Sequence, residues 1–575
     1  MTVVVQEGAI SAPSGGDIDV ANTVLHIPRL DVKPATLDVQ LQTQSSVEAA
    51  LSLMALKPFD VLKEAAFGPD VSQGQAQLTG QLSFPLKKVV QLEDVEFDVA
   101  GSMTNLSSST LMAGQDLTSK RMTLALDPSG LSISGPVDVS GAKADVTWRK
   151  NFGPDHRGKS DISGQLTLNQ DALDAFDISL PKNTVSGSAQ GKVSVALRRG
   201  QDPAFTVTSA LEGLGLSVPA IGFSKPKAQA GTLEVTGTAG DIPSVTNMVI
   251  EAPGLTASEG TVSLTSQGEL DLLEFKTLKV GAWLDSSATL IGRGAGEPVG
   301  VLLRGGSLDL MRSPFGTGDE TESDSSTRKG PIELNIDRLK VTDSYALYGL
   351  DAQLTQNGGL SGRFSGRLNS TAPVTGTVKA GKYGPTIMVT SNDAGKAVMA
   401  AGLLEKASGG DLTFSLVSKP EQGSYDGSVS IKGIKVQSAP RLAELLSLAS
   451  GIGVLDQLSG PGISFAEILS SFEIEPDWIT IKSSSAEGPS LGITSEGVYS
   501  TVSKEIDLQG VISPVYFLNA IGQLVSRKGE GLFGFNFTLK GAVNDPTIGV
   551  NPLSLLTPGA LRGIFRGKTP SAPKN

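Results

Sequence analysis

The sequence predicts an all-β dominated fold in which antiparallel strands each carry one apolar face. Apolar and polar residues alternate with a period of two in short stretches along the whole chain, as strands require. The 575 residues include 68 glycines but only 5% aromatic residues, a composition typical of short strands joined by tight turns. Stretches with helical spacing of apolar residues are few.

The alternation is clearest in five stretches spread from residue 76 to residue 539. Except at Ala196, the residues between the apolar ones are polar or glycine, which is typical of a sheet with one wet face. The apolar members are Ala76, Leu78, Leu82, Phe84, Val193, Val195, Leu197, Ile332, Leu334, Ile336, Ile506, Leu508, Phe533, Phe535, Phe537 and Leu539.

Two glycine patterns accompany these strands. The sequence QNGG at 356–359 lies between two of them, and Asn357-Gly358 suits a tight hairpin turn. An apolar–polar–glycine unit recurs at 78–80, 162–164, 235–237, 431–433, 508–510 and 539–541. Its glycine falls on the apolar face, where it either lets the sheet curl toward that face or simply ends the strand.

Four segments are predicted to form short amphipathic helices, at 47–67, 440–458, 514–526 and 553–565. Pro514 suits the first turn of its helix, because proline has no N–H to leave unbonded there. These helices are too short to cover the predicted sheet.

The segment GTGDETESDSSTRKG at 316–330 contains no apolar residue and predicts a disordered linker. It divides the chain into residues 1–315 and residues 331–566. The last residues, 567–575, are predicted to be a disordered tail.

Composition excludes several function classes. The formal net charge of −12 disfavours a nucleic-acid partner, and the absence of cysteine removes thiolate chemistry. The only histidines, His26 and His156, lie in turn-like sequence, and no Walker lysine and serine follow the glycine-rich stretch GRGAGEPVG at 292–300. We find no catalytic or metal-binding constellation, and therefore predict a protein that is not an enzyme and needs no cofactor. An unrecognised active site is the weaker alternative.

The first residues lack the basic and apolar regions of a signal peptide, and no run of 18 apolar residues occurs. We therefore expect the chain by itself to stay in the cytosol.

The residues alone leave two uses for the apolar face open. Two sheets could stack around a closed core, as in a β-rich structural or adhesin-like module. Alternatively, one long curled sheet could line an apolar groove that holds acyl chains.

Four blocks in the C-terminal part resemble a known family. They are SNDAGKAVMAAGLLEKASGGDLTFSL (391–416), LDQLSGPGISFAEILSSFEIEPDWITI (455–481), GPSLGITSEGVYSTVSKEIDLQGVISPVYFLNAIG (488–522) and GEGLFGFNFTLKGAVNDPTIGVNPLSLLTPGALRGIF (529–565). Their order and spacing resemble the AsmA-like C-terminal region of the YhdP type, in the AsmA/TamB family of envelope lipid-transport proteins. VDVSGAKADVTWRKNF (137–152) is more weakly similar to the preceding region, so the resemblance covers roughly residues 130–566.

The resemblance implies an elongated, twisted β-groove in the Gram-negative envelope. Its implied role is non-enzymatic movement of phospholipids between inner and outer membranes, which supports outer-membrane integrity. The implied partners are phospholipids, both membrane surfaces and other envelope proteins, in the periplasm.

Members of the family usually begin with an inner-membrane helix and a longer groove, both absent here, so we expect a fragment or a start that lies upstream. Arg562 and Arg566 are the candidate headgroup contacts, unless the segment around them merely caps the edge of the sheet.

Overall fold

The structure is a computed structural model of the chain. It describes residues 1–56, 68–91, 94–112, 114–314, 330–438, 443–445, 447, 462–514, 534–551, 553–554 and 568–572. The chain divides into two compact units, Met1–Gly281 and Ala282–Asn575. Strands dominate both units, which confirms the predicted all-β class.

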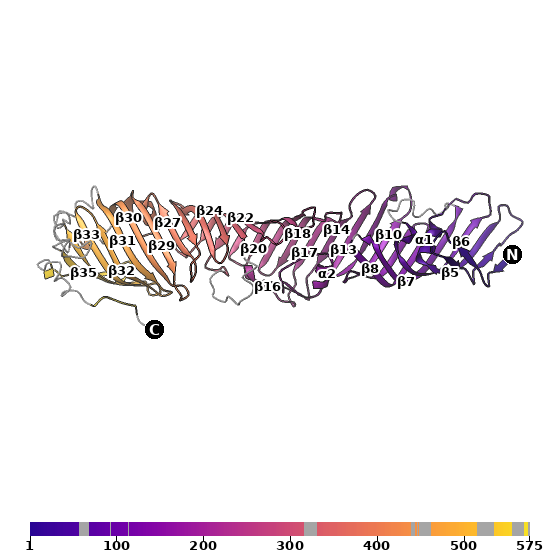
Figure 1. Cartoon of the computed structure of the whole chain (residues 1–575), viewed down its shortest axis with the longest axis horizontal. Coiled ribbons are helices and arrows are strands. Elements are labelled where there is room, and N and C mark those ends of the chain that lie inside the picture. The colour runs from indigo at the N-terminus through magenta and orange to yellow at the C-terminus, as the bar shows by residue number, and fades with distance from the viewer. Residues whose placement is uncertain are drawn as a thin grey trace. The chain divides into compact units, whose positions relative to one another are not determined.

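Unit 1 is built on one antiparallel ladder in which neighbouring strands pair in chain order from β4 onward (Figure 1). Its strands are β4 (Val24–His26), β5 (Thr36–Ser46), β6 (Gln73–Pro85), β7 (Glu96–Met112), β8 (Gln115–Asp127), β9 (Gly130–Val139), β10 (Ala142–Asn151), β11 (Lys159–Leu168), β13 (Ala189–Arg198), β14 (Ala204–Ser209), β17 (Thr232–Thr238), β18 (Ser244–Ala252), β19 (Leu255–Leu264) and β20 (Leu270–Val280).

Shorter strands complete unit 1. β1 (Thr2–Val4) pairs with β4, and β2 (Ala9–Ser11) pairs with β3 (Asp17–Asp19), which touches β5. A separate small sheet consists of β12 (Val185–Gly187), β15 (Leu214–Val218) and β16 (Phe223–Lys225). It is formed by two long connections between neighbouring strands of the ladder, those before β13 and before β17.

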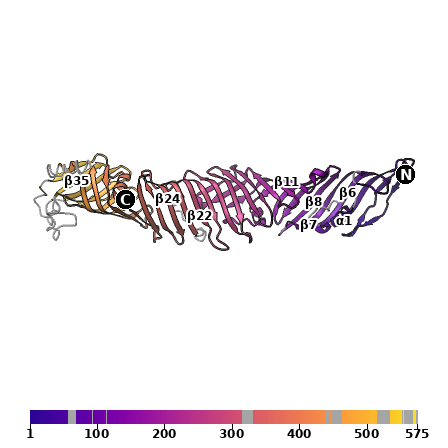
Figure 2. The ribbon, with the colours of Figure 1, turned by 90° about the horizontal axis from the view of Figure 1, so that it is seen from above.

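Unit 2 repeats this plan with its own ladder, whose strands lie side by side in both views (Figure 2). Its strands are β21 (Leu284–Ile291), β22 (Gly300–Asp309), β23 (Gly330–Lys340), β24 (Ala346–Gln356), β25 (Leu360–Leu368), β26 (Ala372–Lys379), β27 (Thr386–Ser391), β28 (Lys406–Ser408), β29 (Asp411–Ser418), β30 (Tyr425–Ser438), β31 (Ile463–Ile474), β32 (Trp478–Glu487), β33 (Leu491–Ser500), β34 (Glu505–Pro514), β35 (Phe535–Ala542) and β36 (Thr547–Asn551).

One pair departs from the predicted antiparallel sheet, because β22 and β23 run parallel. A tight hairpin cannot join parallel strands, so a longer connection separates them in the chain. That connection is the stretch between Asp309 and Gly330, which includes most of the segment 316–330 predicted as a linker. Residues 315–329 lie outside the described residues, so the predicted disorder of the linker stays a prediction.

Three helices begin directly after a strand and are capped by a polar side chain. These are α1 (Val47–Met54), α2 (Gln170–Ala175) and α3 (Ala394–Ala400). Their N-cap residues Ser46, Asn169 and Asp393 each accept a hydrogen bond of 3.0 Å from a backbone N–H of the first turn. Each helix therefore covers the end of the strand that precedes it.

The helix contacts are small and apolar. In unit 1, α1 buries Val47 against Ala76 and Met103, and α2 buries Ala172 against Ala142. In unit 2, α3 buries Ala394 and Val398 beside Ile434. Both helices of unit 1 follow strand ends at the same margin of the ladder, since Ser46 and Leu168 lie at corresponding ends.

Glycines on the apolar face make room for phenylalanine rings of the neighbouring strand. The directly opposed pairs are Phe205–Gly237, Phe275–Gly260, Phe364–Gly376, Phe472–Gly427 and Phe537–Gly510. A Cβ at Gly510 would lie 2.7 Å from the ring of Phe537, and one at Gly260 would lie 2.5 Å from the ring of Phe275. Only glycine lets these rings lie over the neighbouring backbone.

The recurring apolar–polar–glycine unit therefore has two uses. At Gly237 and Gly510 the glycine allows close approach within a strand, as predicted. Gly433 and Gly541 instead have positive φ angles of 73° and 100°, with open space where a Cβ would be. Gly433 lies inside β30, so the alternative in which the glycine ends its strand fits only Gly541, the residue before the last of β35.

The predicted turns and helices are confirmed only in part. A hairpin joins β24 to β25 as predicted, but its positive φ angles are at Gly358 and Gly359 rather than at Asn357. The helix predicted from residue 47 ends at Met54, and residues 57–67 lie outside the described residues.

The structure describes few residues of the other three predicted helices. Pro514 ends β34 instead of beginning a helix, because its strand continues the ladder against Leu491. Most of 440–458 and 553–565, and all of 515–526, lie outside the described residues. The boundary between the compact units falls at Gly281, before the segment that composition singled out.

We expect Gly376→Ala to destabilise unit 2 by about 1–3 kcal/mol, because the new methyl would overlap the ring of Phe364. Gly366→Ala is the matched control on the same face of the neighbouring strand, where a Cβ would meet its nearest atom at an ordinary 3.4 Å. Urea unfolding with hydrogen exchange of β25–β27 measures both. Equal stability of the two variants would contradict the ring-over-glycine packing.

Candidate functional site

The register of the paired strands in unit 1 aligns apolar residues in rows that run across the strands. Directly opposed residues of an antiparallel pair share a face, so a chain of opposed pairs traces one face of the sheet. The first row runs Leu78, Gly101, Leu124, Ile133, Trp148, Ile162, Val195, Phe205 and Gly237, from β6 to β17. At about 4.8 Å per strand, this row is roughly 40 Å long.

A second row on the same face lies beside the first. It runs Gly135, Val146, Gly164, Val193, Val207, Val235, Met248, Gly260 and Phe275, from β9 to β20. Neither row contains a polar or charged side chain. We call the face that carries these two rows the apolar face of unit 1.

The side chains of the apolar face in β11–β20 are half-buried. Val193, Val195, Phe205, Val235 and Phe275 all retain partial exposure to solvent. Side chains under a second layer are normally almost fully buried. No second sheet of described residues therefore covers this part of the face.

Unit 2 carries a longer row of the same kind. It runs Leu290, Val301, Ile332, Leu354, Gly362, Val378, Ile387, Leu416, Gly427, Phe472, Ile481, Gly497, Leu508, Leu539 and Ile548. Every member is apolar or glycine, and most of the side chains are half-buried. We call this the long row of unit 2.

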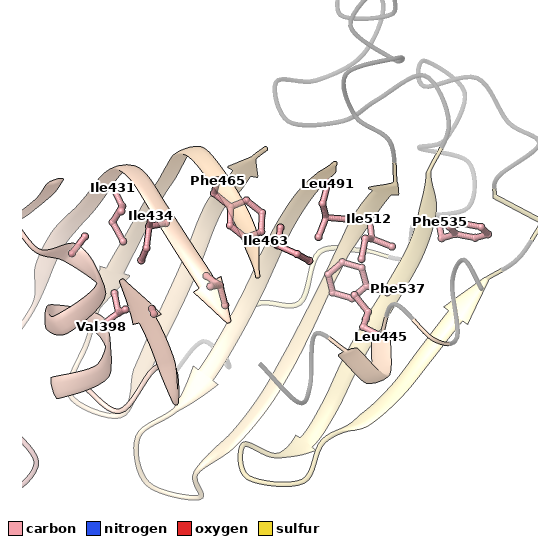
Figure 3. Packing of buried hydrophobic residues seen from close by; sticks show 13 residues of the cluster. Val398, Ile431, Ile434, Leu445, Ile463, Phe465, Leu491, Ile512, Phe535 and Phe537 are labelled. Atoms are coloured by element: carbon pink, nitrogen blue, oxygen red, sulfur yellow. The ribbon is translucent and has the colours of Figure 1, made fainter. Parts of the chain in front are cut away.

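One margin of the same face in unit 2 is closed. Ile434, Ile463, Leu491 and Ile512 are at most 1% exposed, and they pack in one cluster with side chains of α3 and with Leu445. Figure 3 shows these side chains gathered on one side of the strands, with Val398 of α3 beside them. We call this set the closed margin.

The opposite face of both ladders is polar and carries paired charges. Asp507 and Lys540 are directly opposed and 3.1 Å apart, and Lys276 lies 3.0 Å from Glu259. Such exposed pairs contribute little stability, but their charges keep this face wet. The polar and apolar faces therefore differ along the ladders, as the alternation predicted.

The structure places six of the predicted lining residues in the rows and divides the predicted set between the two units. In unit 1, Leu78, Leu82 and Phe84 are half-buried on the apolar face, while Ala76 is buried under α1. Val193 and Val195 lie in the rows, with Leu197 beyond Val195 on the same strand. Ile332, Leu508 and Leu539 belong to the long row; Leu334, Ile336 and Ile506 are on its strands.

The strand 533–539 differs most from its prediction. Phe535 and Phe537 are 8% and 4% exposed and belong to the cluster of the closed margin. The prediction of a wet opposite face is wrong at Asn536, which is 7% exposed. Phe533, Arg562 and Arg566 lie outside the described residues, so their roles stay predictions.

Sequence reasoning missed several members of the rows. Phe205, Met248 and Phe275 in unit 1, and Phe472 and Ile481 in unit 2, occupy equivalent positions. Around Met248, Phe472 and Ile481 the alternation is less clean, because bulges shift the register at Thr236/Gly237 and Ser471/Phe472. The only signal in the sequence that could have identified these residues is a short stretch of alternating apolar and polar residues around each of them.

Titratable groups give no catalytic arrangement in the part of the chain that is described. Among the described residues, Lys225 is the only charged residue whose side chain is fully buried, at 1% exposure. Burial lowers the pKa of Lys225, while the charge of Glu212 opposes that change. Its Nζ donates to the carbonyl oxygens of Leu211 and Leu214, at 2.8 and 2.6 Å, so the ammonium joins the loop 211–214 to β16.

Metal-binding groups of three or more His, Cys, Asp or Glu side chains are also absent from the described residues. His26 is exposed, and its Nδ1 lies 2.9 Å from Thr2 Oγ1. Within the described helices, none has the length and apolar character needed to cross a membrane.

Comparison with known proteins leaves the chain without an assigned family. No family model, no curated protein and no solved structure matches it. The rows and the closed margin therefore carry the functional argument.

We expect Ile512→Ala, at 0% exposure in the closed margin, to lower the free energy of unfolding by about 2–5 kcal/mol. Ile387→Ala, in the half-buried long row, should lower it by about half as much or less, because fewer contacts are lost. Urea unfolding of each variant measures the difference. Equal losses would mean that the long row is covered as completely as the margin.

Proposed function

We propose that the chain is a non-enzymatic lipid-transport protein that shields phospholipid acyl chains against the apolar rows of its sheets. The observation that carries this proposal is the half-buried row of unit 1, which continues from strand to strand without a polar side chain. Exposed apolar surface of this extent is unfavourable in water and marks a binding surface.

The dimensions of the rows suit an acyl chain. The hydrocarbon of one bilayer leaflet is roughly 15 Å thick, since the whole hydrocarbon core is about 30 Å. A row of roughly 40 Å exceeds that length, so several positions along it could hold a chain. Each methylene removed from water contributes about 0.8 kcal/mol, which is enough for binding without any polar contact.

The glycine–phenylalanine pairs suit movement along such a surface. Each ring lies over a glycine of the next strand, which keeps the surface low and free of polar groups. A smooth apolar surface offers no strong site at which a chain would stop. In this proposal the apolar rows line a groove that holds the acyl chain.

Location and partners follow from the same proposal. The resemblance of four C-terminal blocks to the AsmA-like family supports a place in the cell envelope, between inner and outer membranes. Phospholipids, both membrane surfaces and other envelope proteins would be its partners.

The closed margin favours a second candidate, a β-rich structural module of the envelope with a closed core. Its cluster reaches 0% exposure at Leu491 and Ile512, as in an ordinary protein interior. In that case lipid would be absent from the purified protein.

A photo-crosslinking amino acid tests the lipid proposal through side-chain direction. Placed at Val195 or Ile387, it should capture phospholipid when the protein is isolated from membranes and analysed by mass spectrometry. At Ser194 or Met388, one residue away, it should not, because successive side chains point to opposite faces. Met388 is the stringent control, since it is apolar and 43% exposed.

Lipid adducts at both members of a pair would mean unspecific capture. Folded protein without adducts at Val195 and Ile387 would favour the structural module. Native mass spectrometry with lipid analysis of the same preparations gives an independent count of bound phospholipid.

A further inference from the structure

Three basic residues lie where three neighbouring strands of unit 1 end. Lys150 is near the end of β10, Arg157 lies in the turn before β11, and Arg199 follows β13. The pairing of β10 with β11 and of β11 with β13 brings these ends together. We call these three residues the basic rim.

Lys150 lies on the apolar face. It is directly opposed to Leu131 and follows Val146 and Trp148 at alternate positions of β10. Burial follows the same alternation, because Lys150 is half-buried while Arg149 and Asn151 are exposed. A lysine at such a position packs its methylenes on apolar neighbours and holds its ammonium at the edge.

Arg199 continues the alternation of β13 beyond Val195 and Leu197. Its backbone N–H donates to the carbonyl oxygen of Gly158 at 2.9 Å. A Cβ at Gly158 would lie 2.9 Å from Cβ and 3.7 Å from Cδ of Arg199, so the arginine stem runs along this glycine. The guanidinium group of this exposed residue is thereby placed beside the turn that holds Arg157.

The basic rim lacks carboxylate partners among the described residues. None of its three side chains makes an ion pair there. On the polar face, Arg198 forms an ion pair with Asp161 at 2.8 Å and is directly opposed to Lys159. Asp155 contributes one exposed carboxylate to the same turn. In a chain with a net charge of −12, three unpaired cations at one margin of a sheet attract an anion.

The opposite margin of the same strands is closed by a helix. α2 packs on Ala142 at the start of β10 and on Leu166 near the end of β11. The apolar rows of these strands therefore lie between an apolar helix on one side and cations on the other. An anion with an attached hydrocarbon chain matches this arrangement better than a small soluble anion does.

We propose that the basic rim binds the phosphate of a phospholipid headgroup while an acyl chain lies on the apolar face between β10 and β13. This inference rests on the proposed function. Arg199 can give two parallel hydrogen bonds to phosphate oxygens, and Lys150 adds a point charge at the end of the first row.

The test compares two lipids that differ only in the phosphate-containing headgroup. Dioleoyl phosphatidylglycerol and dioleoylglycerol are titrated into the full chain and counted by native mass spectrometry. The unmodified protein should bind phosphatidylglycerol about tenfold more tightly, since charge-assisted hydrogen bonds form only with the phosphate. The double variant Lys150→Gln, Arg199→Gln should lose that preference and keep its affinity for dioleoylglycerol.

The control variant Lys143→Gln, Lys192→Gln removes two charges from the exposed positions of the same strands, on the polar face. It should bind both lipids as the unmodified protein does. Circular dichroism of both variants checks that the strands are retained. An equal loss in the control would mean a general charge effect and would overturn the assignment to the basic rim.

The remaining outcomes separate the two proposals. If neither lipid binds the unmodified protein, the proposed function fails and the basic rim fails with it. If both lipids bind equally and the double variant changes nothing, only the basic rim fails. Glycerol 3-phosphate that displaces phosphatidylglycerol at comparable concentration would identify a site for soluble phosphate esters and overturn the lipid headgroup.

Discussion

Cross-strand register is the constraint on which both units depend. A shift of one residue between two strands would move every apolar side chain of one strand to the polar face. The registers instead keep apolar residues and glycines opposed through every pair, from Leu78 to Gly237 in unit 1 and from Leu290 to Ile548 in unit 2. Bulges such as that at Thr236/Gly237 absorb the residues that would otherwise break a row.

The glycine–phenylalanine pairs help to fix that register. A ring such as Phe275 fits only opposite a residue without a Cβ, so a slipped register would place it against a side chain. Pairs of this kind occur in both units, at Gly260 and at Gly427. They restrict the number of alternative pairings available to a chain that is otherwise rich in similar strands.

Two kinds of apolar surface coexist on the same face of unit 2. At the closed margin, Ile463 and Leu491 have the burial of a protein interior, and they hold α3 against the sheet. Along the long row, Ile387 and Leu416 stay half-buried beside them. The margin stabilises the unit, whereas the row stays partly exposed to solvent.

The sequence by itself determined the strands, the polarity of their two faces and the small share of helix. Alternation at 76–84, 193–197 and 332–336 was sufficient because the period of two is a local property of the backbone. Helix starts at Ser46 and Asp393 also left local signals in the form of capping residues. Each of these features depends on residues close together in the chain.

Tertiary structure alone decided which apolar strands are covered. Phe537 and Val195 occupy equally alternating strands, yet Phe537 is buried at the closed margin and Val195 is half-buried in the first row. The burial of a side chain depends on the elements that pack over its strand, and local periodicity does not predict those elements. The parallel pair β22–β23 and the basic rim were likewise hidden, since both arise from strand ends and pairings that only the folded chain brings together.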